Sequence, residues 1–265
     1  MNTRRILLLA LLPVILEASL HAFSPYEACL NSSQPKQVGL LAQVPPDQRE
    51  AVHQLIEGIL DPANQAQMSQ CGIRNTTAFT RDIGGNTWIV VHFVLDGGQD
   101  YLQAARLFEE ATKANRSLTA KILPHPRATR FGTTWLQMEW INYIRGKDIT
   151  GPATSELMIV TTILPDKEAE YRSLHQTVWP GVVDQVIRSS NRDLCIFLAE
   201  IDNLLVEFLY VEYVGKDKER DDAMSQSDVI NHRWWKLTDA CQKGLPGVEG
   251  NWVEMTQIQG KKTAS

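Results

Sequence analysis

Residues 157–180 read LMIVTTILPDKEAEYRSLHQTVWP, and this stretch sets the pattern for the second half of the chain. Its first eight residues are apolar or β-branched, which predicts a buried strand. Pro165 and Asp166 end that strand and are typical of a helix start. Residues 167–177 continue with a helical pattern, and Pro180 suits the first turn of another helix. The stretch therefore predicts a strand followed by two helices.

The rest of the second half completes an α+β unit. Apolar residues recur at helical spacing after Pro180, at Val182, Val183, Val186 and Ile187. Two strands then flank a hairpin signal, a long helical pattern follows, and a last strand ends the unit, at residues 194–200, 204–214, 216–242 and 252–258. The order β-α-β-β-α-β is the ferredoxin-like arrangement.

The first half repeats features of this unit at a nearly constant spacing. Residues 87–95 form an apolar strand pattern of the same kind. Three short matches recur at spacings of 119, 118 and 117 residues, marked by Pro46 and Pro165, Phe79 and Phe197, and Trp135 and Trp252. Matches at such regular spacing indicate an internal duplication.

One ferredoxin-like sheet exposes an apolar face, which a second copy can bury. We therefore predict an α+β fold in which two ferredoxin-like units form an internal pseudo-dimeric barrel. The polar, turn-rich segment between the two copies is interpreted as a linker. The predicted segments are a signal peptide at 1–22, a degenerate ferredoxin-like unit at 36–143, a linker at 144–155 and the second unit at 156–260.

The N-terminus predicts export. Arg4 and Arg5 precede a short apolar run at residues 6–16, and Ala22 is a small residue suited to cleavage. This is the pattern of a signal peptide, and the run is too short for a comfortable transmembrane helix. We expect a periplasmic or secreted protein.

Charge and cysteine content exclude several partners. The formal net charge is −5 and the chain has no Lys/Arg run, which argues against nucleic acid or an anionic membrane and leaves a small neutral molecule. The four cysteines match no zinc-site spacing, and Cys195 suits a small core residue. The histidines are scattered and no HExxH motif occurs, so we expect no metal.

Two helical patterns in the second half carry groups suited to chemistry. Tyr171 and His175 are spaced i, i+4, so they share a helix face. Trp234 and Trp235 point about 100° apart on a helix, so at least one is expected to line a cleft. Imidazole titrates near neutral pH, and tryptophan faces suit the C–H face of a sugar. Taken alone, such residues more often serve packing than function.

The motifs of the second half resemble those of the L-rhamnose mutarotase family over roughly residues 156–258. The resemblance lies in Tyr171-x-x-x-His175-x-x-x-Trp179-Pro180, Ile196-Phe197-Leu198, Asn203-Leu204-Leu205, Val211-Glu212 and Arg233-Trp234-Trp235-Lys236. It implies that His175 is the catalytic proton donor and that Tyr171, Trp234 and Trp235 bind the sugar. It also implies that no cofactor takes part.

The chain departs from the family in three places. Leu194 stands where the family usually has a sugar-contacting tyrosine, which could alter specificity or weaken binding. The segment 227–232 is about one residue longer than in typical members. In the first copy, Val52 and Ile56 occupy the positions of the tyrosine and histidine, so that copy is interpreted as a structural partner.

The resemblance predicts a sugar mutarotase that interconverts α and β anomers of L-rhamnose or a related 6-deoxy sugar. His175 would protonate the ring oxygen, with Tyr171 or water assisting at the anomeric hydroxyl. One alternative is a non-catalytic sugar-binding protein that keeps the cleft. Another, from fold analogy alone, is a haem-binding or oxygen-using protein with an axial histidine. Association into a homodimer stays open.

Overall fold

The computed structural model describes residues 22–23, 33–83, 85–112, 118, 120–146 and 151–260. The signal peptide predicted at residues 1–22 therefore falls, except for its last residue, outside the described residues. Cys29 also lies outside them, and the other three cysteines are free thiols. None of the described helices combines the length and apolar character needed to cross a membrane.

The described part of the first half contains four strands of one sheet, the helices that cover it and two strands that belong to the other sheet. These are β2 (Lys36–Val44), α2 (Arg49–Ile59), α3 (Pro62–Gln70), β3 (Ile73–Ile83), β4 (Asn86–Leu95), α4 (Ala104–Ala111), α6 (Pro126–Thr129), β5 (Leu136–Gln137) and β6 (Glu139–Arg145), with β1 (Ala22–Phe23) before them. Short 3-10 turns precede α2 and α4, at Pro46–Gln48 and Tyr101–Gln103.

The second half begins with the strand and helices predicted from residues 157–180. Its elements are β7 (Ser155–Ile163), the turn Pro165–Lys167, α7 (Glu168–Gln176), α8 (Pro180–Arg188), β8 (Asn191–Ile201), β9 (Leu204–Tyr213), α9 (Lys218–Ser227), α10 (Val229–Asp239), β10 (Gln242–Lys243), β11 (Val253–Glu254) and β12 (Thr256–Ile258). Pro180 occupies the first turn of α8, as predicted.

The helix predicted at 216–242 is two helices, α9 and α10. Asp228 separates them, because its extended backbone ends α9 and its side chain caps α10. The Asp228 carboxylate accepts hydrogen bonds from the backbone N–H groups of Ile230 and Asn231 at 2.8 and 3.0 Å. Aspartate is a preferred N-cap residue, so this local bond outweighs the continuous helical pattern.

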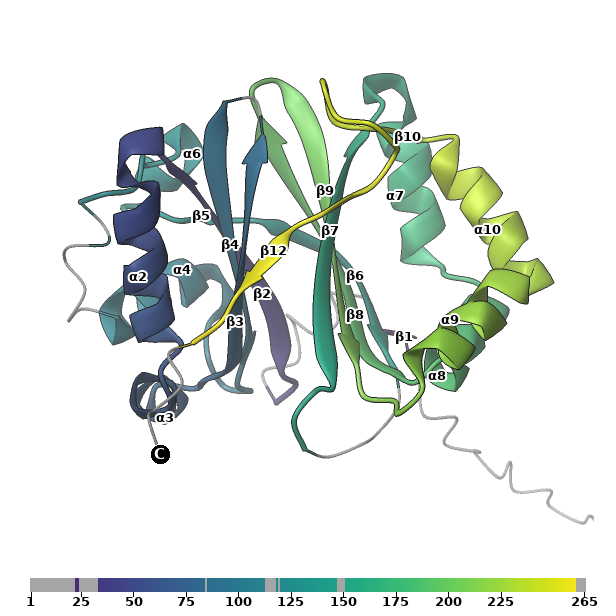
Figure 1. Cartoon of the computed structure of the whole chain (residues 1–265), viewed down its shortest axis with the longest axis horizontal. Helices are drawn as coiled ribbons and strands as arrows, with labels where there is room; N and C mark the ends of the chain where they lie inside the picture. Colours follow the sequence, from purple (N-terminus) through teal and green to yellow (C-terminus); the bar gives the residue numbers. More distant parts are fainter. Residues whose placement is uncertain are drawn as a thin grey trace, which may run out of the picture.

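The strands form two antiparallel sheets with helices on their outer sides (Figure 1). One sheet has the order β12-β3-β4-β2-β5, and the other has β1-β6-β8-β9-β7-β10, with β11 also paired to β7. The orders β3-β4-β2-β5 and β8-β9-β7-β10 are the same when the strands of each half are numbered along the chain. The mixed α+β architecture is therefore confirmed, while the duplication stays a prediction.

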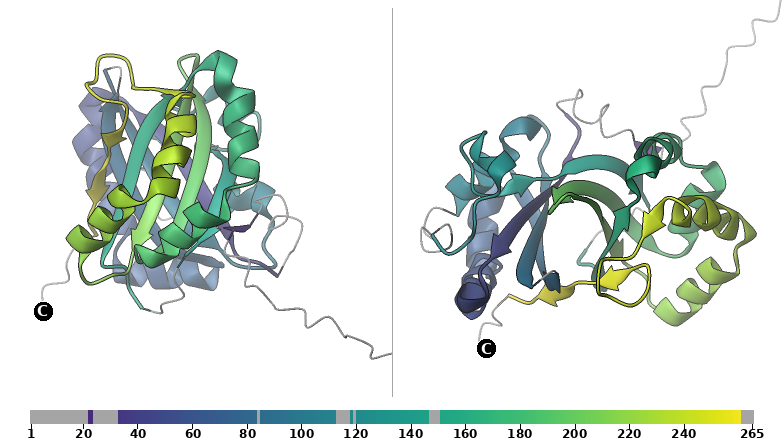
Figure 2. Two further views of the ribbon diagram at one scale, coloured as in Figure 1. Left: turned by 90° about the vertical axis from the view of Figure 1, so that its right-hand side faces the viewer. Right: turned by 90° about the horizontal axis from the view of Figure 1, so that it is seen from above.

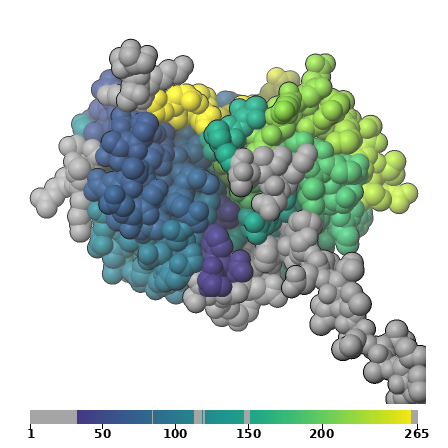
Figure 3. All heavy atoms as spheres, turned by 90° about the horizontal axis from the view of Figure 1, so that it is seen from below, coloured from purple at the N-terminus to yellow at the C-terminus, as the bar shows by residue number. Residues whose placement is uncertain are grey.

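Each half adds a strand to the sheet of the other half. β6 pairs with β8, and β12 pairs with β3. The last strand, predicted as one element at 252–258, is split at Met255: β11 pairs with β7 and β12 crosses to the first sheet. Met138 divides β5 from β6 in the same way. Figure 3 shows the yellow C-terminal segment lying against the blue first half.

The two sheets face each other across an apolar core, and the one containing β8 and β9 is strongly curved (Figure 2). Alternate residues of β8 and β9 enter this core, among them Cys195, Phe197, Phe208 and Tyr210. The burial of Cys195 agrees with its predicted role as a small core residue. The intervening residues of these strands point the other way, toward the helices of the second half. That outer face of the strands forms one wall of a pocket.

Substitutions at neighbouring positions of β9 test this two-sided burial. Phe208→Ala should lower the free energy of unfolding by about 3–5 kcal/mol, because it opens a cavity between the sheets. Leu209→Ala should cost clearly less, because the side chain is half-buried and lines the pocket. Urea unfolding followed by far-UV circular dichroism measures both. Equal losses would contradict the assignment of the two faces.

Candidate functional site

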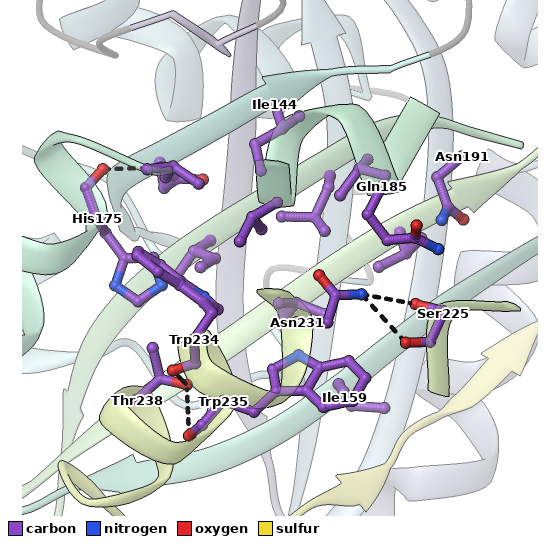
Figure 4. A pocket seen from close by; sticks show the side chains of 18 of the residues that line it. Ile144, Ile159, His175, Gln185, Asn191, Ser225, Asn231, Trp234, Trp235 and Thr238 are labelled. Carbon is purple, nitrogen blue, oxygen red and sulfur yellow. Dashed lines mark hydrogen bonds between the residues drawn. The ribbon is translucent and has the colours of Figure 1, made fainter. Parts of the chain in front are cut away.

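A pocket of about 250 Å³ lies between the outer face of the second sheet and the helices α7, α8 and α10 (Figure 4). Its floor is apolar and includes Ile159, Leu194 and Leu209 from three neighbouring strands. The volume is just below the roughly 300–1,000 Å³ of sites for drug-sized ligands. The pocket therefore suits a ligand about as large as a monosaccharide.

Tyr171 and His175 meet in this pocket, as their i, i+4 spacing predicts. Their ring centroids are 4.2 Å apart. The His175 Nδ1 atom lies 3.0 Å from the backbone carbonyl oxygen of Tyr171. A carbonyl oxygen can only accept a hydrogen bond, so Nδ1 carries the proton in the neutral ring. Nε2 is consequently left with a free lone pair.

The His175 side chain is buried, and burial lowers its pKa from 6.5 to about 4, although the bond to the Tyr171 carbonyl acts in the opposite direction. Desolvation penalises the charged imidazolium. His175 is therefore neutral at pH 7 and is ready to accept a proton through Nε2.

Both predicted tryptophans line the pocket. Trp234 is buried and presents its indole in an edge-to-face contact with His175, with centroids 5.4 Å apart. Trp235 is half-buried, and Figure 4 shows its indole beside Ile159. Trp179 lies outside the pocket lining and packs against Trp234 at 5.6 Å. Trp179 thus supports the indole that contacts the histidine.

The positions at which the sequence departs from the family pattern are also described by the structure. Leu194 lines the pocket with an apolar side chain. Val52 and Ile56 are fully buried in the core of the first half. The first half nevertheless reaches the pocket, because strand β6 places Asn142 and Ile144 in its wall. The interpretation of the first copy as a structural partner did not anticipate this contribution.

Sequence reasoning missed several buried polar residues of the pocket, among them Asn142, Gln185 and Glu207. Asn142 donates a hydrogen bond from Nδ2 to the backbone carbonyl of His175 at 2.8 Å. Glu207 interrupts the apolar pattern of strand β9, which was a readable signal. The other two gave none, because single amides on helices and strands are usually solvated.

Glu207 is fully buried and accepts a hydrogen bond from Nε2 of Gln242 at 2.8 Å. Burial raises its pKa to about 7, against the opposing effects of Tyr171 and Gln242. Burial, and next the Glu207 charge, raise the pKa of Tyr171 well above its ordinary value. The Tyr171 hydroxyl makes no hydrogen bond of ordinary geometry within the described structure. Below about pH 7, the Tyr171 hydroxyl and most of the Glu207 carboxyl population are therefore protonated.

The remaining described histidines lie elsewhere. His92 is buried between the sheets against Tyr210, with ring centroids 3.8 Å apart. His125 caps α6, and His232 packs beside Trp235 on the outside of α10. Within the described residues, no group of three or more His, Cys, Asp or Glu side chains could hold a metal ion.

Comparisons with known proteins point to one family for the second half. The L-rhamnose mutarotase family model matches residues 156–259. The L-rhamnose mutarotase of Oceanobacillus iheyensis is 30% identical over 84 residues, which are 32% of this chain and 76% of the relative. That of Burkholderia ambifaria is 33% identical over 86 residues, covering 31% and 76%.

A solved structure shares the fold over most of the chain. The crystal structure of a candidate monooxygenase from Fusobacterium nucleatum matches with a TM-score of 0.50 at 12% identity. The match covers 85% of this chain and 93% of that one. At this identity the likeness concerns the fold alone.

Replacing Glu207 tests its burial as an ionisable group. The pKa of Glu207 is higher in the folded chain than its ordinary 4.5, so the unfolded chain ionises first. The free energy of unfolding therefore falls as the pH rises from 4.5 toward 7. Glu207→Gln should therefore match the parent near pH 4.5 and exceed it above pH 7 by on the order of 3 kcal/mol. Thermal or urea unfolding across this range measures the difference. The exposed Glu249→Gln variant should show no such gain.

Proposed function

The chain belongs to the L-rhamnose mutarotase family, and on that premise we propose that it interconverts the α and β anomers of L-rhamnose or a related 6-deoxy sugar. One observation carries the proposal: His175, Tyr171, Trp234 and Trp235 line a single pocket of monosaccharide size. His175 is the acid/base, and the other three bind the sugar. The reaction is that of a carbohydrate isomerase.

In this proposal the neutral His175 acts first as a base. Nε2 takes the proton of the anomeric hydroxyl while the bond between C1 and the ring oxygen breaks and the carbonyl forms. The imidazolium then gives its proton to the departing ring oxygen, which is bonded to the same carbon. One nitrogen can reach both oxygens, so a single histidine can shuttle the proton. The Tyr171 carbonyl stabilises the imidazolium through Nδ1–H.

Rotation about the C1–C2 bond turns the other face of the aldehyde toward the hydroxyl that closes the ring. As that hydroxyl attacks C1, His175 removes its proton. The imidazolium then gives the proton to the carbonyl oxygen, which becomes the new anomeric hydroxyl. Atoms and protons are balanced, so no metal or redox group is consumed. Mutarotation already proceeds slowly in water, which means that a modest acid/base contribution is sufficient.

The tryptophans are proposed to hold the apolar part of the sugar. Trp234 and Trp235 provide rigid aromatic surface, and Ile159 and Leu194 extend it across the pocket floor. A 6-deoxy sugar carries a methyl group in place of a hydroxymethyl group, so it matches this surface better than an ordinary hexose does. Leu194 contributes to the apolar contact where a tyrosine hydroxyl would bind a sugar oxygen.

We also propose that the fold arose by duplication of one ferredoxin-like unit into a pseudo-dimeric barrel. Two features support this proposal. The strand order of both sheets is the same, and each half sends its C-terminal strand to the other sheet after a methionine, Met138 or Met255. The backbone N–H of each methionine donates to a strand of its own half, β2 for Met138 and β7 for Met255, at 2.8 and 2.9 Å.

A non-catalytic sugar-binding protein is the second candidate, and Leu194 favours it because a polar contact to the sugar is missing there. The two candidates differ in one measurable property. A mutarotase accelerates exchange between anomers, whereas a binding protein shifts the NMR signals of the sugar without raising the exchange rate.

Replacement of His175 tests the catalytic assignment. His175→Ala should reduce the protein-dependent anomer exchange of L-rhamnose by about 10²–10⁴-fold, because the proton shuttle is removed. Saturation-transfer NMR measures the exchange rate. His53→Ala is the matched control, because His53 lies on α2, the helix of the first half that follows β2 as α7 follows β7. Unchanged exchange in His175→Ala would refute the role of His175.

The pH dependence of exchange tests the base-first order. Only the neutral imidazole can accept the proton, so the protein-dependent rate at low sugar concentration should be full above the pKa of His175 and fall as the pH drops through about 4. The exchange in buffer alone is subtracted at each pH. The Glu207→Gln variant should show the same fall in rate near pH 4. A midpoint near 6.5 would contradict the buried, neutral state of the ring.

A further inference from the structure

Gln185 is a buried polar residue of the pocket that the proposed mechanism does not use. It lies on α8 between the buried Val182 and Val186, and its exposed fraction is 1%. Neither Oε1 nor Nε2 has a hydrogen-bond partner within the described structure. Buried polar atoms almost always have a partner, so a carboxamide with two unpaired atoms at a pocket wall indicates a place for a polar ligand.

Asn142 gives a second, independent indication. Its Nδ2 is bound to the backbone carbonyl of His175, which fixes the plane of the amide. Its Oδ1 is buried and has no partner in the described structure, although the residue lines the same pocket. The bond on one side of the amide therefore leaves an acceptor available beside the helix that carries His175.

The other three amides of the pocket already donate hydrogen bonds. Gln242 donates from Nε2 to Glu207 at 2.8 Å, and its buried Oε1 has no partner in the described structure. Asn231 donates to Ser225, at 3.3 Å to its carbonyl and 3.1 Å to its hydroxyl, and Asn191 donates to the Ser189 hydroxyl at 3.1 Å. Figure 4 places Gln185 and His175 at different ends of the pocket, with Trp234 beside the histidine. The unpaired polar atoms of Gln185 thus lie away from the reacting end.

We propose that Gln185 determines specificity by binding two neighbouring hydroxyl groups on the sugar edge opposite the anomeric carbon, with Asn142 Oδ1 accepting from a further hydroxyl. This rests on the proposed function, because it assumes that the anomeric carbon lies at His175. A carboxamide carries a donor and an acceptor side by side, which matches a vicinal diol, where each hydroxyl can donate and accept. The ligand class is a free 6-deoxyhexose whose C3 and C4 hydroxyls are both present.

The central variant is Gln185→Met, which keeps the length of the side chain and removes both polar atoms. The ligand-free variant should unfold at the same temperature as the parent or higher, because no internal hydrogen bond is lost. Its dissociation constant for L-rhamnose should rise about 10- to 100-fold. The control is Gln226→Met on the exposed side of α9, which should change neither quantity. A Gln185→Met variant that binds L-rhamnose as tightly as the parent would overturn the proposal.

A comparison of sugars locates the contact. The parent should bind 3-deoxy- or 4-deoxy-L-rhamnose at least about tenfold more weakly than L-rhamnose. The Gln185→Met variant should bind each deoxy sugar almost as tightly as it binds L-rhamnose. An equal penalty in parent and variant would show that Gln185 does not contact these hydroxyls, and this result would overturn the proposal.

Binding is measured in a His175→Ala background as well, so that it does not depend on turnover. Hydroxyl-dependent binding without accelerated exchange in the parent would refute the proposed mutarotase and leave the role of Gln185 standing. Accelerated exchange together with unchanged binding in Gln185→Met would refute the role of Gln185 alone. Failure of the parent to bind any 6-deoxyhexose would overturn both.

Discussion

The structure depends on the burial of both faces of strands β8 and β9. Alternate side chains such as Phe197 and Phe208 fill the core between the sheets, and the residues between them line the pocket. Because side chains alternate along a strand, a shift of one residue would move apolar core residues into the pocket and Glu207 into the core. The packing that holds the two halves together therefore also fixes which residues the pocket presents.

The orientation of His175 also depends on the packing of the two halves. The backbone carbonyl of Tyr171 fixes Nδ1 of the His175 ring. Asn142, from the other half of the chain, donates a hydrogen bond to the backbone carbonyl of His175. A carboxylate in place of that carbonyl would raise the pKa of the ring, whereas a neutral acceptor leaves the effect of burial dominant. The strand exchange that brings β6 beside β8 thus determines the surroundings of the reacting ring.

The sequence predicted the parts that depend on local periodicity. The strand and helices of residues 157–180 follow from runs of apolar residues and from helix-start residues, and the meeting of Tyr171 with His175 follows from their spacing of four. The break at Asp228, the split at Met255 and the arrival of Asn142 in the pocket depend on capping or on contacts with the other half. The unpaired atoms of Gln185 are visible only in three dimensions, because sequence does not show whether an amide has a partner.

Electrostatics connects the pocket with the class of its ligand. Of the described residues that line it, none is lysine or arginine, and the acidic ones are Glu207 and Asp239. A phosphorylated sugar would bring a dianion next to these carboxyls without a cation to pair with it, and desolvating such a charge is costly. A neutral sugar loses little on entry, because amides and aromatic rings can meet its hydroxyls and C–H groups. The neutral state of His175 at pH 7 belongs to the same arrangement, since a permanent imidazolium in this pocket would have to be paired or hydrated.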